Sequence, residues 1–173
     1  MIKKLLIKNY KGVKEANICF NTDTNVIVGN NGVGKSTIIE ALTLSLGFGL
    51  NQLEITPSLF NIDTIKQFES DKILPSITIE VYFDGKNDEF SGKNNFLHEN
   101  CSGIRLKICF DEDTYLDLYE QEKDCIKQIP CEYYKIERNW FSDKKVIQRL
   151  IPYSIQVVDS TSNYFNLNSA TLL

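Results

Sequence analysis

A glycine-rich run near the amino terminus has the residue types and the spacing that bind the phosphates of a nucleotide. The run satisfies the pattern G-x-x-x-x-G-K-[ST] at every specified position. It comprises Gly29, Asn30, Asn31, Gly32, Val33, Gly34, Lys35, Ser36 and Thr37. Glycines let the backbone turn so that several N–H groups face one anion, and a helix that begins at the end of the run adds the positive end of its dipole. Residues 29–37 therefore predict a binding site for ATP and Mg²⁺.

The polar side chains of this run have separate expected roles. Lys35 is the expected catalytic residue, because its ammonium can reach the β- and γ-phosphates. The hydroxyl of Ser36 is the expected Mg²⁺ ligand, and Thr37 is expected on the α-phosphate side. A glycine-rich turn that only caps a helix is the alternative, but such a turn does not require a lysine and two hydroxyls in this order. The sequence favours the nucleotide site.

Local signals predict the elements that position this run. Residues 25–28 are expected to form a strand that leads into it, and residues 36–46 a helix that Gly47 ends. Residues 2–8 and 17–20 are expected to form an opening hairpin, since Asn and Gly in the connection between them supply turn chemistry. The order strand, glycine loop, helix is the context that the motif requires.

Residues 76–140 show alternation that predicts an antiparallel β region. Strands are expected at 76–83, at 104–110 with a hairpin partner at 115–119, and at 132–138. Outside this region, a short helix is expected to begin near Pro57 with Thr56 as its cap, a short amphipathic helix at 143–150 and a last strand at 154–158. Residues 84–100 are rich in Asn, Asp, Lys, Ser and Gly, so a mobile surface loop is expected there.

Two acidic segments are candidates for the carboxylates that hold Mg²⁺ and a hydrolytic water. Asp111 and Glu112 end an apolar run, but Arg105 and Lys107 interrupt it, and a hairpin tip is the favoured interpretation. The second segment is residues 155–159, where Gln156 or Asp159 could deliver a polar side chain toward the γ-phosphate and the metal. The sequence leaves the roles of these two residues open.

Length and composition indicate one compact domain, residues 1–173. The formal net charge of -4 gives no general attraction for a polyanion. The five cysteines include no C-x-x-C pair and His98 is the only histidine, which favours a reducing cytoplasm and argues against a structural zinc site. Lys3, Lys4 and Lys8 interrupt the first apolar residues, so neither a signal peptide nor a membrane span is expected there.

Two parts of the chain resemble known ATPases. Residues 7–12 and 29–41 resemble the opening of ABC-type ATPases related to RecF and SMC. Residues 129–135 and 151–162 resemble the ATPase half of OLD-family (overcoming lysogenization defect) endonucleases, which act on DNA in phage defence or repair. The resemblance implies an α/β P-loop NTPase fold with a mixed sheet and an antiparallel β meander. It also implies that Lys11 reaches the bound nucleotide, although a solvated strand-edge lysine is the equal alternative.

The chain departs from this family by omission. It has no Leu-Ser-Gly-Gly-type signature, no Asp-Glu strand after such a signature and no Toprim carboxylates. We therefore expect an ABC-type ATPase N-terminal lobe with a truncated C-terminal end, incomplete for hydrolysis alone. The expected partners are a second ATPase domain or a second copy, with DNA reached only through missing regions and no membrane. The alternatives are a small P-loop phosphotransferase and a non-enzymatic nucleotide-dependent assembly module.

Overall fold

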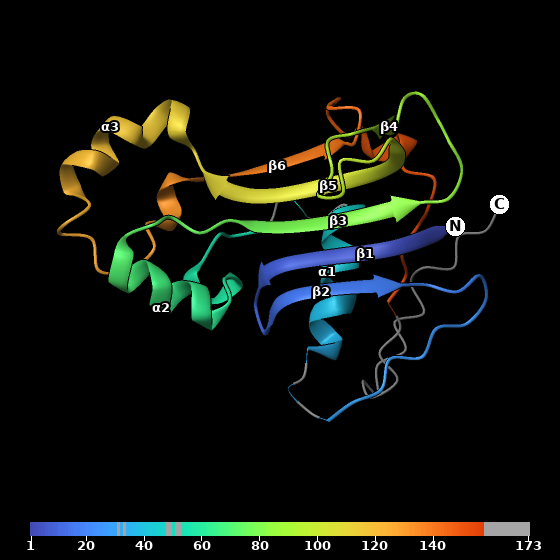
Figure 1. Cartoon of the computed structure of the whole chain (residues 1–173), viewed down its shortest axis with the longest axis horizontal. Helices are drawn as coiled ribbons and strands as arrows, with labels where there is room; N and C mark the ends of the chain where they lie inside the picture. The colour runs from blue at the N-terminus through green and yellow to red at the C-terminus, as the bar shows by residue number, and fades with distance from the viewer. Residues whose placement is uncertain (31, 33, 48–49, 51–52, 158–173) are drawn as a thin grey trace, which may run out of the picture.

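A curved antiparallel sheet forms the body of the molecule, and one long helix packs on its inner face (Figure 1). The computed structural model describes residues 1–157 except 31, 33, 48–49 and 51–52. The strand order is β2-β1-β3-β5, and β4 and β6 both pair with β5. The elements are β1 (Ile2–Tyr10), β2 (Val13–Cys19), α1 (Lys35–Leu46), α2 (Ile62–Asp71), β3 (Ile77–Phe83), β4 (Ser91–Gly92), β5 (Cys101–Phe110), α3 (Glu112–Glu122) and β6 (Tyr134–Trp140). Short 3-10 turns occur at Pro57–Leu59, Cys131–Tyr133 and Gln148–Leu150.

The opening hairpin confirms the sequence prediction, with a tighter turn than expected. The pairing of β1 with β2 continues to Tyr10 opposite Val13, so β2 begins earlier than residue 17. Asn9 and Lys11 adopt positive φ values of 57° and 48°, and the Asn9 side chain donates to the Ser76 carbonyl oxygen at 3.0 Å. The turn is therefore fixed by backbone conformation and also by a contact to the start of β3.

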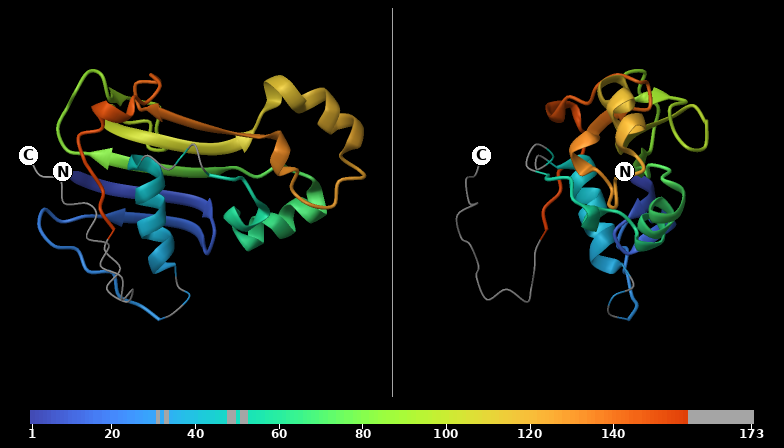
Figure 2. Two further views of the ribbon diagram at one scale, coloured as in Figure 1. Left: turned by 180° about the vertical axis from the view of Figure 1, so that it is seen from behind. Right: turned by 90° about the vertical axis from the view of Figure 1, so that its left-hand side faces the viewer.

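The core lies between the sheet and α1. Leu5, Ile7, Ile79, Val81 and Ile104 are fully buried on the inner face of the sheet. Figure 2 shows α1 across this face. Its buried side chains are mostly small, at Thr37, Ala41, Ser45 and Leu46. Small side chains let the helix axis approach the strands closely, and this packing places the amino-terminal end of α1 next to the β1–β2 hairpin.

A second, smaller cluster covers part of the outer face. Leu6, Tyr82 and Phe141 pack together there, with the Tyr82 and Phe141 ring centroids 4.8 Å apart. Gly103 makes room for this packing, since a Cβ at that position would lie 2.1 Å from the Phe141 ring. The sheet is therefore buried on both sides at this point.

The prediction that residues 115–119 pair with β5 as a hairpin strand is wrong. Residues 115–119 do not form a strand; they belong to α3, and the strand that pairs with β5 on the side away from β3 is β6. Glu112 and Asp113 favour a helix start, because carboxylates stabilise the first turn of a helix. Tyr119 is buried, whereas Leu116 and Leu118 are 47% and 39% exposed. The alternation was therefore a misleading signal, and Asp111 precedes a helix instead of forming a hairpin tip.

Four further expectations differ from the structure. Residues 25–28 form no strand, and Val26 and Val28 are 76% and 83% exposed. Residues 143–150 do not form the expected amphipathic helix, and only Gln148–Leu150 form a 3-10 turn. The residues before this turn run along β6, where Val146 N donates to Arg138 O at 3.1 Å. Residues 154–157 are not a strand, and Val158 lies outside the described residues. All strand pairs in the described ranges are antiparallel, so the expected mixed sheet is antiparallel there.

Helix α2 was missed by the sequence analysis. The expected helix near Pro57 is only a 3-10 turn, and the Thr56 side chain makes no capping bond. The longer helix starts after Asn61, whose side-chain oxygen accepts from Asp63 N at 3.1 Å. The Asn61 amide also donates to the Lys11 carbonyl oxygen at 2.9 Å. Asn61 is thus an N-cap residue that also ties α2 to the β1–β2 turn.

The segment 84–100 is packed against the sheet and is not the mobile loop expected from its composition. Phe90 and Asn95 in this segment are buried, and Ser91–Gly92 pairs with β5. The fully buried carboxylate of Glu80 accepts from Phe96 N at 3.0 Å and from Arg105 Nε at 2.7 Å. It also accepts from the Tyr82 hydroxyl at 2.5 Å. Glu80 and Arg105 form an ion pair between β3 and β5, and the bond from the Phe96 N–H to Glu80 attaches the polar segment to this pair.

Lys135 fastens the start of α3 to β6, and this contact predicts a loss of stability in acid. Its Nζ lies 2.9 Å from the Asp111 carboxylate and 3.3 Å from those of Asp113 and Glu137. The Thr114 hydroxyl and then Lys135 hold the pKa of Asp111 below its usual range. A carboxylate with a lowered folded pKa adds stability that is present above its unfolded pKa of about 4 and is lost as pH falls through the folded value.

We expect a Lys135→Met variant to unfold more easily than the wild type at pH 7 and to lose less stability between pH 5 and pH 2. Urea unfolding across this range measures both effects. Lys123→Met is the matched control, since Lys123 follows α3 directly and forms a local ion pair with Glu120 at the end of that helix. If the free energy of unfolding changes with pH in the same way for Lys135→Met and for the wild type, the contact between Lys135 and Asp111 does not stabilise the fold.

Candidate phosphate-binding site

The glycine loop, residues 29–37, leads directly into α1. The helix begins at Lys35 after Gly34, and Gly32 and Gly34 have φ values of 82° and 95°. Residues that carry a Cβ atom rarely adopt positive φ values of this size. A Cβ on Gly34 would also lie 2.9 Å from the Val13 Cγ2 atom on β2. Glycine is therefore required at Gly34 both by the backbone turn and by the close approach of the hairpin.

Lys35 folds back over the glycine loop. Its Nζ donates to the carbonyl oxygens of Gly29 at 2.7 Å and Asn30 at 2.6 Å. Ser36 is exposed at the start of α1, whereas Thr37 is 8% exposed and lies on the helix face that also carries Ala41. The structure thus brings Lys35, Ser36 and the loop backbone together at one helix end. Asn31 and Val33 lie outside the described residues.

Lys11 is ion-paired to α1 and is not a free strand-edge lysine. Its Nζ lies 2.5 Å from the Glu40 carboxylate, and the pair borders a hollow of about 380 Å³ beside α1. Burial, and then the Glu40 carboxylate, raise the pKa of the neighbouring Tyr10. The contact holds Lys11 beside Glu40, which follows Lys35 in α1 by about one and a half helical turns.

Asp111 and two arginines make contacts elsewhere in the fold. Asp111 is engaged by Lys135 at the start of α3, far from the glycine loop along the sheet (Figure 1). Arg105 bonds Glu80, and Arg138 donates to Gly47 O at 3.0 Å. These two arginines therefore have structural contacts in the described part of the chain. Gln156 is exposed, and Asp159 lies outside the described residues.

The residues at the glycine loop fit a magnesium–nucleotide complex. Within the described ranges, no cluster of three or more His, Cys, Asp or Glu side chains could hold a metal ion by itself. Mg²⁺ does not need such a cluster at a phosphate site, because it keeps several waters and takes its other ligands from one or two protein groups and the phosphates. The exposed Ser36 hydroxyl is a suitable protein ligand of this kind.

Comparison with known proteins identifies the family. Residues 4–170 match the family described as AAA domain. The chain belongs to this family. This match, together with the strand and helix arrangement, confirms the α/β P-loop NTPase class and the relationship to ABC-type ATPases of the OLD, RecF and SMC groups.

Three relatives illustrate the relationship. The OLD nuclease of Thermus scotoductus is 30% identical over 118 residues, which are 68% of this chain and 20% of that protein. The DNA double-strand break repair Rad50 ATPase of Archaeoglobus fulgidus is 42% identical over 50 residues, 29% of this chain and 6% of the relative. The DNA replication and repair protein RecF of Chlamydia caviae is 38% identical over 60 residues, 34% and 16% respectively. The matched part of the chain thus spans a fifth or less of each of these proteins.

No helix in the described ranges combines the length and the apolar composition needed to cross a bilayer.

Proposed function

We propose that the chain binds Mg-ATP through the glycine loop, residues 29–37. The observation that carries this proposal is the position of the Lys35 ammonium, which lies over the loop at the amino-terminal end of α1. There the ammonium, the backbone N–H groups of the loop and the positive end of the helix dipole can act on the same anion. A triphosphate has the negative charge and the acceptor oxygens that suit this arrangement.

Each residue of the loop has a proposed role in this complex. Lys35 exchanges its bonds with the carbonyl oxygens of Gly29 and Asn30 for charge-assisted bonds to the β- and γ-phosphates. Ser36 provides the protein ligand for Mg²⁺, which when bound neutralises part of the phosphate charge. Thr37 lies toward the α-phosphate. Gly29, Asn30, Asn31, Gly32, Val33 and Gly34 supply the backbone that surrounds the phosphate chain.

Lys11 is proposed as an additional nucleotide contact. The ion pair with Glu40 keeps its ammonium beside α1, from which a rotation of the flexible lysine side chain could bring it to a bound nucleotide. In this proposal Glu40 competes with the nucleotide for Lys11. The contribution of Lys11 to affinity is therefore smaller than that of Lys35, because its bond to Glu40 must first be broken.

We further propose that residues 1–173 act as the N-terminal ATPase lobe of an OLD-like, DNA-acting protein of repair or phage defence. In this arrangement hydrolysis needs a second ATPase domain or a second copy, and DNA is reached through other regions of the complete protein. The similarity to the OLD nuclease, Rad50 and RecF supports the proposal. All five cysteines are free thiols, which is compatible with the reducing cytoplasm.

Calorimetric titration with Mg-ATP, combined with an assay of phosphate release, tests this function. We expect the chain to bind Mg-ATP and to hydrolyse it at well below the roughly 1 to 10³ s⁻¹ of complete enzymes. A folded chain that binds no Mg-ATP would contradict the nucleotide site. Turnover within the range of complete enzymes would contradict the need for a second ATPase domain while leaving the nucleotide site intact.

A further inference from the structure

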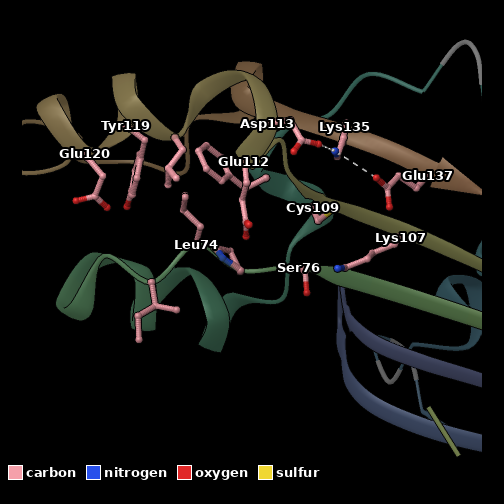
Figure 3. A pocket seen from close by; sticks show the side chains of 14 residues that line it. Leu74, Ser76, Lys107, Cys109, Glu112, Asp113, Tyr119, Glu120, Lys135 and Glu137 are labelled. Carbon is pink, nitrogen blue, oxygen red and sulfur yellow. Dashed lines mark hydrogen bonds and ion pairs between the residues drawn. The ribbon is translucent and has the colours of Figure 1, made fainter. Parts of the chain in front are cut away.

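A groove separate from the glycine loop lies where α2 and α3 extend beyond the end of the sheet. It has a volume of about 540 Å³. One wall is the segment 73–76 that joins α2 to β3, and the other wall is α3 with the ends of β5 and β6 (Figure 3). β3 and β5 pair as far as Ile77 opposite Ile108 and then diverge, which opens the groove between them.

Hydrogen bonds across the interior hold both walls of the groove in place. The Tyr119 hydroxyl on α3 donates to Lys72 O at 2.6 Å, next to the opposite wall. The Tyr134 hydroxyl on β6 donates to Pro75 O at 2.8 Å. The groove therefore exists in the folded chain before any partner binds, so a partner does not have to supply the free energy to form it.

Apolar side chains line the groove and remain open to solvent. Ile73 on one wall is 64% exposed and Leu116 on the other is 47% exposed. Phe110 and the buried Tyr119 lie in the same lining. Ile73 and Leu116 would each lose water contact when a partner enters between them, and this is the usual anchor chemistry of a docking groove.

The charged groups around these apolar residues are mainly acidic. Four carboxylates line the groove, those of Glu112, Asp113, Glu120 and Glu137, against the two ammonium groups of Lys107 and Lys135. Lys135 is already paired with Asp113 and Glu137 (Figure 3). It also pairs with the adjacent Asp111, and Glu120 pairs with Lys123 at 2.7 Å. The lining therefore carries a net negative charge, which repels nucleic-acid phosphates and attracts Lys and Arg side chains.

We propose that this acidic groove docks a basic amphipathic segment of a partner protein. Apolar residues of the segment pack against Ile73 and Leu116, and its Lys or Arg side chains face the carboxylates of α3 and β6. This arrangement combines apolar and charge-paired contacts, the two kinds of contact that helix-in-groove and peptide-docking sites use. The proposal depends on neither the glycine loop nor bound nucleotide.

Fluorescence anisotropy with a labelled amphipathic peptide of Leu and Lys tests the groove on the whole chain. We expect Leu116→Ser to weaken peptide binding by about tenfold or more, as for a hot-spot residue. Leu118→Ser is the matched control, since Leu118 is 39% exposed on the same helix and does not line the groove. It should leave peptide affinity within about twofold of wild type. Thermal melts of both variants verify that each is folded.

A second pair of variants tests the role of charge. Glu120→Lys in the groove should weaken binding of the same peptide, and Asp117→Lys, an exposed position on α3 outside the lining, should weaken it less. A peptide with Glu in place of every Lys should not bind. Equal effects of the paired variants, or equal binding of the acidic peptide, would overturn the proposal. Self-association that Leu116→Ser abolishes in sedimentation would also overturn it, because the occupant would then be a second copy of this chain.

Discussion

Lys35→Ala is expected to remove the stabilisation that Mg-ATP gives to the wild-type chain. A ligand at about 100 times its dissociation constant adds roughly 2.7 kcal/mol to the free energy of unfolding, which corresponds to a rise in Tm of roughly 5–10 °C for a domain of this size. The Lys35 ammonium is the one charged group placed over the loop in the described part of the site, where it bonds Gly29 O and Asn30 O. Differential scanning calorimetry with and without Mg-ATP measures the effect.

The matched control for this prediction is Lys14→Ala. Lys14 is an exposed lysine on β2 that pairs with Asp63, so its removal changes the net charge by the same amount without touching the glycine loop. We expect the Lys14 variant to keep the full Tm shift. Without nucleotide, Lys35→Ala should melt within a degree or two of the wild type, since its bonds are at the surface. An undiminished shift in Lys35→Ala would remove the main support for the phosphate site.

Glu80→Ala is expected to cause the largest loss of stability, about 3 kcal/mol in the free energy of unfolding. The Glu80 carboxylate is fully buried and accepts bonds from Arg105, Tyr82 and the Phe96 N–H. Alanine removes the acceptor for all three donors and leaves the Arg105 guanidinium, which is three-quarters buried, without its ion-pair partner. Urea unfolding of the variant measures the loss.

Glu15→Ala is the control for this second prediction. Glu15 also forms an ion pair on the same sheet, with Lys8 at 3.5 Å, but its side chain is 63% exposed. Exposed pairs contribute little, so we expect a change within about 0.5 kcal/mol. Hydrogen exchange adds a local test, because the Phe96 N–H should lose protection in Glu80→Ala. Equal losses in the two variants would show that the buried contact has no special role.

The local elements could be predicted from short stretches of sequence. The glycine loop, α1 with its end at Gly47, the opening hairpin and β3 each depend on residues within about a dozen positions of one another. Turn chemistry, helix ends and the alternation of a half-buried strand are all short-range effects. The glycine loop and the helix that follows it were therefore predictable before any contact was known.

Longer-range contacts decided the remaining features. Glu80 alternates along β3 like a solvent-facing residue, and only the packing of Arg105 and the 84–100 segment buries it. The residues after β5 alternate like a strand, but β6 occupies the β5 edge and leaves them as α3.

The amino-acid sequence by itself thus determined the family and the position of the glycine loop ahead of α1, because both depend on a contiguous motif. The tertiary structure alone decided the Lys11–Glu40 ion pair, the partner of β5 and the acidic groove. Each of these joins residues from separate elements, so its existence depends on how the sheet and helices pack and on which charges that packing brings together.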